Sequence, residues 1–250
     1  MKSIAIIPAR YASTRFPGKP LADLGGKTMI QRVHDQALAV FRNVVVATDD
    51  DRIAAAVRNF GGNVVMTSPS HKSGTDRCAE ALEIWEQMHS TQYDVIINVQ
   101  GDEPFIQPSQ LQLLQSCFVK KEIPIATLGK PVHSIQDLLD PNKPKVVLDK
   151  NSDAIYFSRS VIPFLRGYET EAWLDHHNFL IHIGLYAFRR EALTTITKLE
   201  ATPLEKAESL EQLRWIENGY RIRVKLTDYE SYGIDTPEDL SKAVEMLKKV

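Results

Sequence analysis

Three cationic side chains recur in the loop that follows the first apolar run of the chain. Arg10, Arg15 and Lys19 stand at intervals of five and four residues, with prolines and a glycine interspersed over residues 8–20. Proline and glycine break a helix, so the three cations do not form one helical face. A positively charged loop at the end of a strand is suited to a phosphate chain, and a solvated basic loop is the alternative.

Two carboxylates are candidates for a metal site. Asp102 follows the apolar run 93–99 and stands next to a glycine, an arrangement that can anchor Mg²⁺. The alternative is a turn residue that caps the helix beginning near Pro108. Asp235 lies just before the expected cap of the last helix, where its carboxylate can point into a site and act as a metal partner of Asp102.

A strand expected over residues 179–188 presents a polar face. His182 and Tyr186 fall on the same side of it with a glycine between them, because side chains alternate along a strand. This pattern favours a polar ligand pocket, and a structural histidine is the alternative.

The helix expected over residues 203–218 also has a polar face. Its spacing of i, i+3, i+4 and i+7 aligns Glu208, Glu211, Gln212 and Trp215. Composition alone favours a solvated face here.

Ser73, Gly74 and Thr75 form a turn that opens a helix expected over about 76–89. Ser73 or Thr75 can cap this helix. The backbone N–H groups of the turn can meet an anion or the edge of a base. Because Ser or Thr caps many helices, the turn indicates a site only together with other features.

Four strand–helix units must position these side chains. Short apolar runs alternate with segments of 3.6-residue periodicity, which predicts alternating strands and helices. The strands are expected at 4–7, 43–48, 64–66 and 93–99, and the helices at 29–40, 53–60, 76–89 and from 108. Short crossovers favour a doubly wound parallel sheet, in which ligands bind at the carboxyl ends of the strands.

From residue 123 the pattern changes to strands with fewer helices between them. The expected strands lie at 125–131, 145–149, 154–158, 179–188 and 221–226. They predict an antiparallel or mixed extension of the sheet. The polar segment 167–178 is predicted to be a surface loop.

Composition excludes several classes of protein. The 250 residues carry 30 basic and 32 acidic side chains, a net charge of −2, which argues against general nucleic-acid binding. Cys78 and Cys117 have no spacing typical of a zinc site and are expected to be reduced, buried thiols. We expect a cytoplasmic protein, because we find no signal peptide and no apolar run near the ~18 residues of a membrane span.

The ordered motifs together resemble the sugar-acid cytidylyltransferases, most closely those that activate 3-deoxy-manno-octulosonate (Kdo). The resemblance spans nearly the whole chain. The motifs that carry it are 7–10, 13–20, 73–77, 98–104, 145–149, 156–159, 182–186, 210–214 and 233–240.

This resemblance implies a single nucleotidyltransferase domain over residues 1–250 with a nucleotide-diphospho-sugar transferase-like (Rossmann-like) fold. A CTP-binding half is expected at 1–122, and a sugar-binding and dimerisation half at 123–250. Mg²⁺ and a homodimer are also implied. The implied CTP-binding residues are Pro8, Ala9, Arg10, Arg15, Lys19, Ser73, Gly74, Thr75, Arg77, Gln100 and Asp102.

The resemblance also assigns the catalytic, metal and sugar sites. The implied catalytic residues are Arg10, Arg15, Lys19, Asp102 and Asp235, of which the two aspartates hold the metal. The implied Kdo-binding residues are Gln100, Arg159, His182, Tyr186, Glu211 and Gln212. A guanidinium pairs bidentately with a carboxylate, so Arg159 is expected to bind the sugar carboxylate. No general base is identified, and residues 166–175 receive no role.

The expected reaction joins Kdo to CTP, giving CMP-Kdo and pyrophosphate for lipopolysaccharide synthesis. Three alternatives stay open. The first is a cytidylyltransferase for another sugar acid, the second a glycosyltransferase on the same fold, and the third a non-catalytic nucleotide-binding module.

Overall fold

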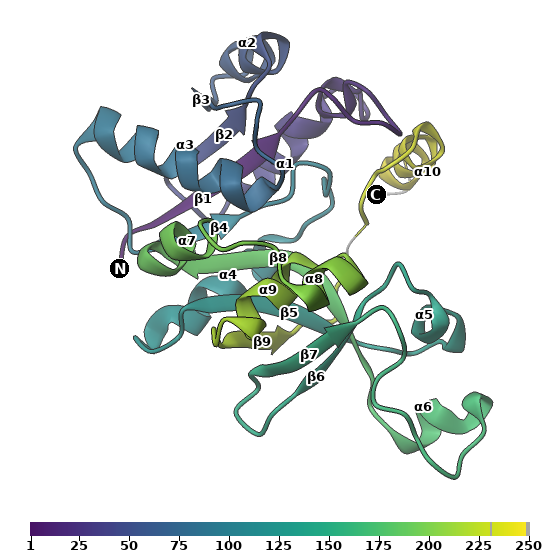
Figure 1. The fold of residues 1–250 in the computed structure, drawn as a ribbon. Helices are drawn as coiled ribbons and strands as arrows, with labels where there is room; N and C mark the ends of the chain where they lie inside the picture. The colour runs from purple at the N-terminus through teal and green to yellow at the C-terminus, as the bar shows by residue number, and fades with distance from the viewer. Residues whose placement is uncertain (231, 249–250) are drawn as a thin grey trace. The chain divides into compact units, whose positions relative to one another are not determined.

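The computed structural model describes residues 1–230 and 232–248. The chain forms two compact units (Figure 1). The first comprises residues 1–115 and the segment that follows Glu230, and the second comprises residues 116–230. Each unit is described by itself below. The prediction of a CTP-binding half at 1–122 and a sugar-binding half at 123–250 stays a prediction.

The first unit contains four parallel strands. β1 (Ser3–Ala9), β2 (Val44–Thr48), β3 (Asn63–Met66) and β4 (Val95–Asn98) lie in the order β3-β2-β1-β4. All residues of β2 and β4 are buried, as expected for a parallel sheet covered on both faces. The four predicted strands are confirmed.

The order of these strands reverses beside β1. The chain places β2 and β3 on one side of β1 and then returns to place β4 on the other side. In open α/β sheets, such a reversal leaves a crevice at the carboxyl ends of the two central strands. The loops that follow β1 and β4 therefore begin at a position suited to ligand binding.

The helices of the first unit begin where their sequences place capping side chains. They are α1 (Met29–Leu38), α2 (Asp51–Asn59), α3 (Gly74–His89), α4 (Pro108–Ser116), α10 (Pro237–Leu247) and the short 3-10 helix η1 (Lys19–Leu21). Thr28, Asp50, Ser73 and Thr236 accept hydrogen bonds from the backbone of α1, α2, α3 and α10, respectively. The predicted capping role of Ser73 is confirmed.

The C-terminal helix α10 packs in the first unit (Figure 1). Leu24, Met29, Ile234 and Ala243 form a buried cluster, and Tyr232 packs against it. This apolar contact holds the segment before α10 beside the loop that follows β1.

The second unit contains mixed pairing. β5 (Ile125–Pro131) pairs antiparallel with β8 (Leu180–Arg189) and parallel with β9 (Ile222–Leu226). β6 (Lys145–Leu148) and β7 (Ala154–Ser158) form an antiparallel pair. The predicted mainly parallel α/β fold with a mixed extension is confirmed.

The helices of the second unit were less well predicted. They are α5 (Ile135–Leu139), α6 (Trp173–His176), α7 (Arg190–Ile196), α8 (Pro203–Glu208), α9 (Glu211–Glu217) and the 3-10 helices η2 (Cys117–Val119) and η3 (Thr170–Ala172). α5 and α7 were not predicted. The expected surface loop at 167–178 is wrong in part, because it contains η3 and α6. Trp173 of α6 is buried against Val132 and Phe179.

The single helix predicted over 203–218 is also wrong. Ser209 has a left-handed backbone with φ 50°, which ends α8 before α9 begins. The predicted face that includes both Glu208 and Glu211 therefore does not exist as one helical stripe.

The two cysteines, Cys78 and Cys117, are buried thiols, as the sequence predicts. Within residues 1–230 and 232–248, no helix has the length and apolar character needed to cross a membrane.

Candidate active site

A cavity of about 350 Å³ lies in the first unit where β1 and β4 end. Its walls come from three loops and from the residues around the start of α3. The lining residues are Pro8, Ala9, Arg10, Ala12, Ser13, Thr14, Arg15, Lys19, Pro20, His71, Lys72, Ser73, Gly74, Arg77, Gln100, Gly101, Asp102 and Asp235. The cavity thus occupies the crevice that the strand order predicts.

The loop after β4 and the start of α3 both approach Pro8 closely. A Cβ atom on Gly101 would lie 2.8 Å from the carbonyl oxygen of Pro8, and one on Gly74 would lie 3.1 Å from its ring. A side chain at Gly101 is therefore excluded unless the backbone moves. The two glycines let the loop after β4 and the start of α3 meet the end of β1.

The cationic loop is folded back on itself. The N–H of Gly18 donates to the carbonyl of Tyr11 at 2.9 Å, and the φ of Gly18 is 73°. The Arg52 guanidinium lies 3.3 Å from the centre of the Tyr11 ring, and Asp50 holds that guanidinium at 2.7 Å. The capping residue of α2 thus also orients the loop that carries Arg10 and Arg15.

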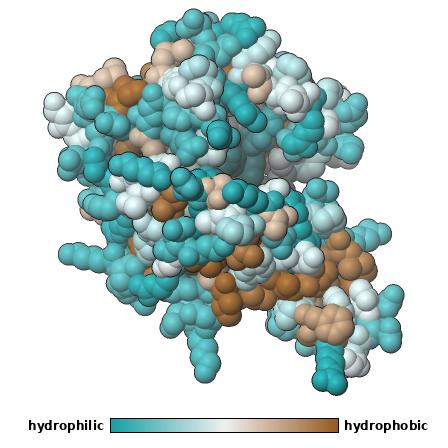
Figure 2. Space-filling model, viewed as in Figure 1, coloured by the Kyte–Doolittle hydropathy of each residue, from teal (hydrophilic) through white to brown (hydrophobic). Residues whose placement is uncertain are grey.

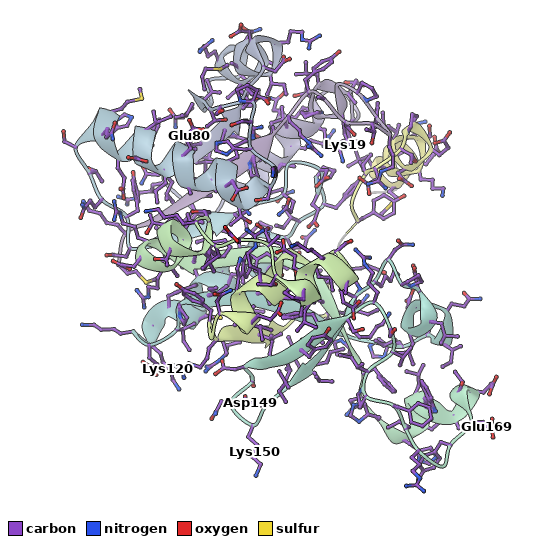
Figure 3. The ribbon with its side chains drawn as sticks, in the orientation of Figure 1. Lys19, Glu80, Lys120, Asp149, Lys150 and Glu169 are labelled. Carbon is purple, nitrogen blue, oxygen red and sulfur yellow. The ribbon has the colours of Figure 1, made fainter. Side chains whose placement is uncertain are left out.

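Two carboxylates converge on one cation in this cavity. Lys19 Nζ lies 2.7 Å from Asp102 Oδ2 and 3.1 Å from Asp235 Oδ1. The Lys19 side chain is 12% exposed and extends from η1 (Figure 3). Arg15 adds an ion pair to Asp235 at 3.1 Å. The structure therefore brings together four of the five predicted catalytic residues, and the fifth, Arg10, lines the same cavity.

The Asp102–Asp235 pair fits a divalent cation. Both groups supply the oxygen ligands that Mg²⁺ prefers, and the shared ammonium shows that this position stabilises positive charge. Among the described residues, no group of three or more His, Cys, Asp or Glu side chains is placed to hold a metal. A magnesium ion here would complete its shell with water and substrate oxygens, as Mg²⁺ does at phosphate-binding sites.

Arg77 is held firmly in the cavity wall. Its side chain is 4% exposed, pairs with Asp49 at 3.0 Å and donates to Thr67 Oγ1 at 2.6 Å. Asp49 and Thr67 follow β2 and β3 directly. The ends of two strands thus set the direction of this guanidinium.

The structure adds residues that the sequence reasoning missed. His71 and Lys72 line the cavity, as do Ser13 and Thr14. His71 Nε2 lies 2.5 Å from Glu80 Oε2 of α3, which also accepts from the N–H of Ser68. The proximity of His71 and Lys72 to the Ser73 cap was the available signal. Thr75, which was predicted to bind CTP, is buried and is not among the lining residues.

The other polar cluster lies in the second unit. His182 Nε2 is 3.0 Å from Thr127 Oγ1, whose hydroxyl has backbone carbonyls at Ile183 and Leu185 to donate to. Burial lowers the pKa of His182 to about 3, so the ring is neutral at pH 7. The neutral ring donates from Nε2 to Thr127 and keeps Nδ1 as an acceptor.

Two buried polar side chains of the second unit, Tyr186 and Gln212, have atoms without a partner among the described residues. Across the part of the chain that the structure describes, Tyr186 Oη and Gln212 Nε2 are among the buried atoms without a hydrogen-bond partner. The Tyr186 ring lies 5.3 Å from that of His182 and 5.0 Å edge-on from that of Trp215. Burial, and to a lesser degree Glu211, raises the pKa of Tyr186, so its hydroxyl stays protonated. Unsatisfied buried polar atoms are costly, which points to a polar ligand.

Arg159 is engaged with backbone carbonyls. Its guanidinium donates to Glu208 O at 2.6 Å, Pro141 O at 2.9 Å and Ser209 O at 3.3 Å. The fully buried Lys145 donates to the adjacent Asp140 O at 2.9 Å. The two cations therefore donate to the backbone carbonyls of residues 140 and 141. The binding of a sugar carboxylate by Arg159 stays a prediction.

The chain is similar to known cytidylyltransferases. The family model described as "Cytidylyltransferase" matches residues 4–225. A 3-deoxy-manno-octulosonate cytidylyltransferase of Parabacteroides distasonis is 59% identical, with 99% of this chain and 98% of the relative aligned. One from Bacteroides thetaiotaomicron is 57% identical over 99% of both chains.

A solved structure is similar along the whole chain. The structure of CMP:2-keto-3-deoxy-manno-octonic acid synthetase complexed with CTP has a TM-score of 0.89 and 42% identity, covering 100% of this chain and 99% of that one. A 4-diphosphocytidyl-2C-methyl-D-erythritol synthase from Anaerococcus prevotii has a TM-score of 0.58 at 13% identity, which shows a shared fold alone.

Proposed function

This chain belongs to the 3-deoxy-manno-octulosonate cytidylyltransferase family, and we propose that it activates Kdo with CTP, releasing CMP-Kdo and pyrophosphate. The observation that carries the proposal is the pairing of Asp102 and Asp235 with Lys19 and Arg15 in one cavity. Carboxylates for a metal and cations for phosphates are the parts that nucleotidyl transfer requires.

CTP binds in the cavity of the first unit. Its triphosphate carries about four negative charges at neutral pH, which Arg10, Arg15 and Lys19 are suited to neutralise. Lys72 adds a further cation to the wall. Arg77 and the turn at Ser73 and Gly74 offer donors to the cytosine, and the rigid support of Arg77 by Asp49 favours recognition of one base edge.

Asp102 and Asp235 hold Mg²⁺ in this proposal. When bound, the ion stabilises the charge on the phosphate oxygens and acidifies the attacking hydroxyl. The two carboxylates, one in the loop after β4 and one in the segment before α10, would hold the ion. The Arg15 side chain is 65% exposed, and its guanidinium can contact the outer phosphates of CTP.

Kdo binds through the polar cluster of the second unit, and the assignment of Gln100 to the sugar stays a prediction. His182 Nδ1 accepts from a sugar hydroxyl, while Tyr186 Oη and Gln212 Nε2 donate to sugar oxygens. Glu211 accepts from a hydroxyl, and Arg159 faces the sugar carboxylate. The unsatisfied state of Tyr186 Oη and Gln212 Nε2 supports a ligand rich in hydroxyls.

In the reaction, the anomeric hydroxyl of Kdo gives its proton to water, and its oxygen bonds to the α-phosphorus of CTP as the bond from that phosphorus to the bridging oxygen breaks. The electron pair leaves with pyrophosphate, whose charge Arg10, Arg15 and Lys19 neutralise. Phosphoryl chemistry depends mainly on positioning and charge stabilisation. We assign no side chain as general base.

We further propose a cytoplasmic homodimer that supplies lipopolysaccharide synthesis. Figure 2 shows apolar atoms over the β6–β7 hairpin and toward α5 and α6. Exposed apolar side chains in this unit include Phe164 at 74%, Ile155 at 56% and Leu139 at 51%. Such a patch favours contact with another protein surface. Sedimentation analysis that gives a monomer at micromolar concentration contradicts the dimer.

The function is tested by measuring pyrophosphate release from CTP with Kdo and Mg²⁺. A sialic acid or an amino-substituted Kdo, offered separately, tests the sugar specificity. If another acid is turned over faster than Kdo, that acid is the substrate of the enzyme. Folded protein that binds CTP but releases no pyrophosphate with any acid contradicts the proposal. Transfer of sugar from a nucleotide sugar supports the glycosyltransferase alternative.

A further inference from the structure

We propose that Lys19 occupies the metal position in the free enzyme and must leave it before the metal binds. This inference rests on the proposed function and concerns the regulation of the same site. In the free protein, one ammonium satisfies both carboxylates. When CTP arrives with the metal, Lys19 moves to the triphosphate and the metal takes its place.

The contacts identify Lys19 rather than Arg15 as the exchanging cation. Lys19 touches both Asp102 and Asp235 and is 12% exposed. Arg15 touches Asp235 alone and is 65% exposed. A cation bound by the same two carboxylates competes directly with Lys19 for their oxygens, whereas Arg15 can stay in place on one side.

The local structure allows this exchange. Lys19 begins η1, and the next residue, Pro20, is buried, which fixes the backbone. The side chain is a flexible four-carbon stem that ends in a compact charge. Its ammonium can therefore change partners while the loop keeps its fold.

The charges make metal and nucleotide binding interdependent. Metal alone displaces Lys19 from two carboxylates and leaves its ammonium with no anion in exchange. Metal together with a triphosphate offers Lys19 new oxygen partners. The free enzyme should therefore bind the metal weakly and bind the metal–nucleotide complex well, and the coupling is reciprocal.

The experiment measures Mn²⁺ binding without nucleotide, by the loss of the free Mn²⁺ EPR signal. The variants are Lys19→Met, which keeps the apolar stem, and Lys19→Arg, which keeps the charge. The matched control is Lys27→Met, because Lys27 also pairs with an aspartate, Asp35, at 2.6 Å, in an exposed pair that lies outside the cavity lining. Circular dichroism and thermal unfolding establish that each variant is folded.

We expect Lys19→Met to bind Mn²⁺ at least tenfold more tightly than the unmodified protein. Lys19→Arg and Lys27→Met should stay within about twofold of it. With a non-hydrolysable CTP analogue present, the advantage of Lys19→Met should disappear or reverse, because the variant has lost a phosphate partner. Equal or weaker Mn²⁺ binding by folded Lys19→Met overturns the inference, whatever the affinity of Lys19→Arg.

A second substitution separates this inference from the metal assignment. If Lys19→Met binds no better than the unmodified protein but Asp235→Asn weakens binding in both, the metal site stands and the role of Lys19 is wrong. If Asp102→Asn and Asp235→Asn leave Mn²⁺ binding unchanged in every background, the carboxylates hold no metal and both proposals fail.

Discussion

The backbone N–H of Ile234 donates to the carbonyl oxygen of Asp102 at 3.0 Å. This bond ties the segment before α10 to the loop after β4. The buried Ile234 side chain adds an apolar anchor with Leu24 and Met29. This backbone bond and this apolar contact together fix the positions of Asp102 and Asp235, which are far apart in the chain. The two carboxylates are therefore brought together by more than their own ion pairs.

Replacement of Asp235 by Asn should lower kcat by roughly two orders of magnitude, equivalent to about 3 kcal/mol in the barrier. The amide keeps the size but loses the charge that the metal requires. Pyrophosphate release should be titrated with Mg²⁺. The control is Glu238→Gln, an acidic residue in the first turn of α10. Full Mg²⁺-dependent activity in Asp235→Asn contradicts the metal assignment.

Replacement of Gly101 by Ala should weaken CTP binding and destabilise the fold by about 1–3 kcal/mol. The added Cβ would lie 2.8 Å from the Pro8 carbonyl, so the end of β1 must move. The control is Gly233→Ala, since no atom lies within 4 Å of its added Cβ. Denaturant unfolding and CTP titration provide the two readouts. Equal behaviour of the two variants argues against the close approach at Pro8.

Replacement of Asp49 by Asn should raise the KM for CTP several-fold and destabilise the protein by about 1–3 kcal/mol. It leaves the nearly buried Arg77 guanidinium without its charged partner. The control is Asp35→Asn, which breaks the exposed pair with Lys27 and should cost at most about 1 kcal/mol. An unchanged KM in folded Asp49→Asn means that the ion pair does not position Arg77 for CTP.

Replacement of Tyr186 by Phe should leave stability unchanged within about 0.5 kcal/mol, because Oη has no hydrogen-bond partner among the described residues. The KM for Kdo should rise five- to tenfold, equivalent to about 1 kcal/mol. CTP binding should not change. A large loss of stability, or an unchanged KM for Kdo, contradicts the assignment of this hydroxyl to the sugar.

His182 should make the protein less stable below neutral pH. Burial holds the pKa of the folded state at about 3, whereas an unfolded histidine has a pKa of about 6.5. Between these values the unfolded chain binds more protons, so stability falls as pH decreases. The loss from this residue between pH 7 and pH 5 is about 2 kcal/mol.

The measurement is denaturant unfolding of the protein and of His182→Gln at pH 7 and pH 5. Glutamine can still donate to Thr127 but does not titrate. The variant should therefore lose less stability than the parent over this interval. Equal losses mean that another group accounts for the pH dependence.

Much of the first unit follows from its sequence. The runs at 4–7 and 43–48 are apolar without the alternation of a half-exposed strand, so they indicate buried strands. Each run is followed by turn or capping residues. Because parallel strands end at the same edge of a sheet, the loop with Arg15 and the turn with Asp102 could be placed together. The place of Asp235 just before the cap of the last helix suggested a metal partner for Asp102, and the family resemblance assigned both aspartates to the metal.

The second unit was harder, because tertiary contacts override local pattern there. No glycine or proline marks the break at Ser209, so residues 203–218 resembled one helix. Trp173 is buried in an otherwise polar segment because it packs in a cluster with Val132 and Phe179. The pairing of β5 with β8 shifts register between Thr127 and Leu128, and simple alternation along residues 179–188 does not reveal such a shift.

The position of Asp235 also has a consequence during synthesis on the ribosome. A nascent chain that ends near residue 230 already contains the cationic loop and Asp102, but not the second carboxylate or the Ile234 contact. Lys19 then has one aspartate partner instead of two, and the pair that fits a divalent ion does not yet exist. The order of residues along the chain thus delays assembly of the site until the segment before α10 has been made.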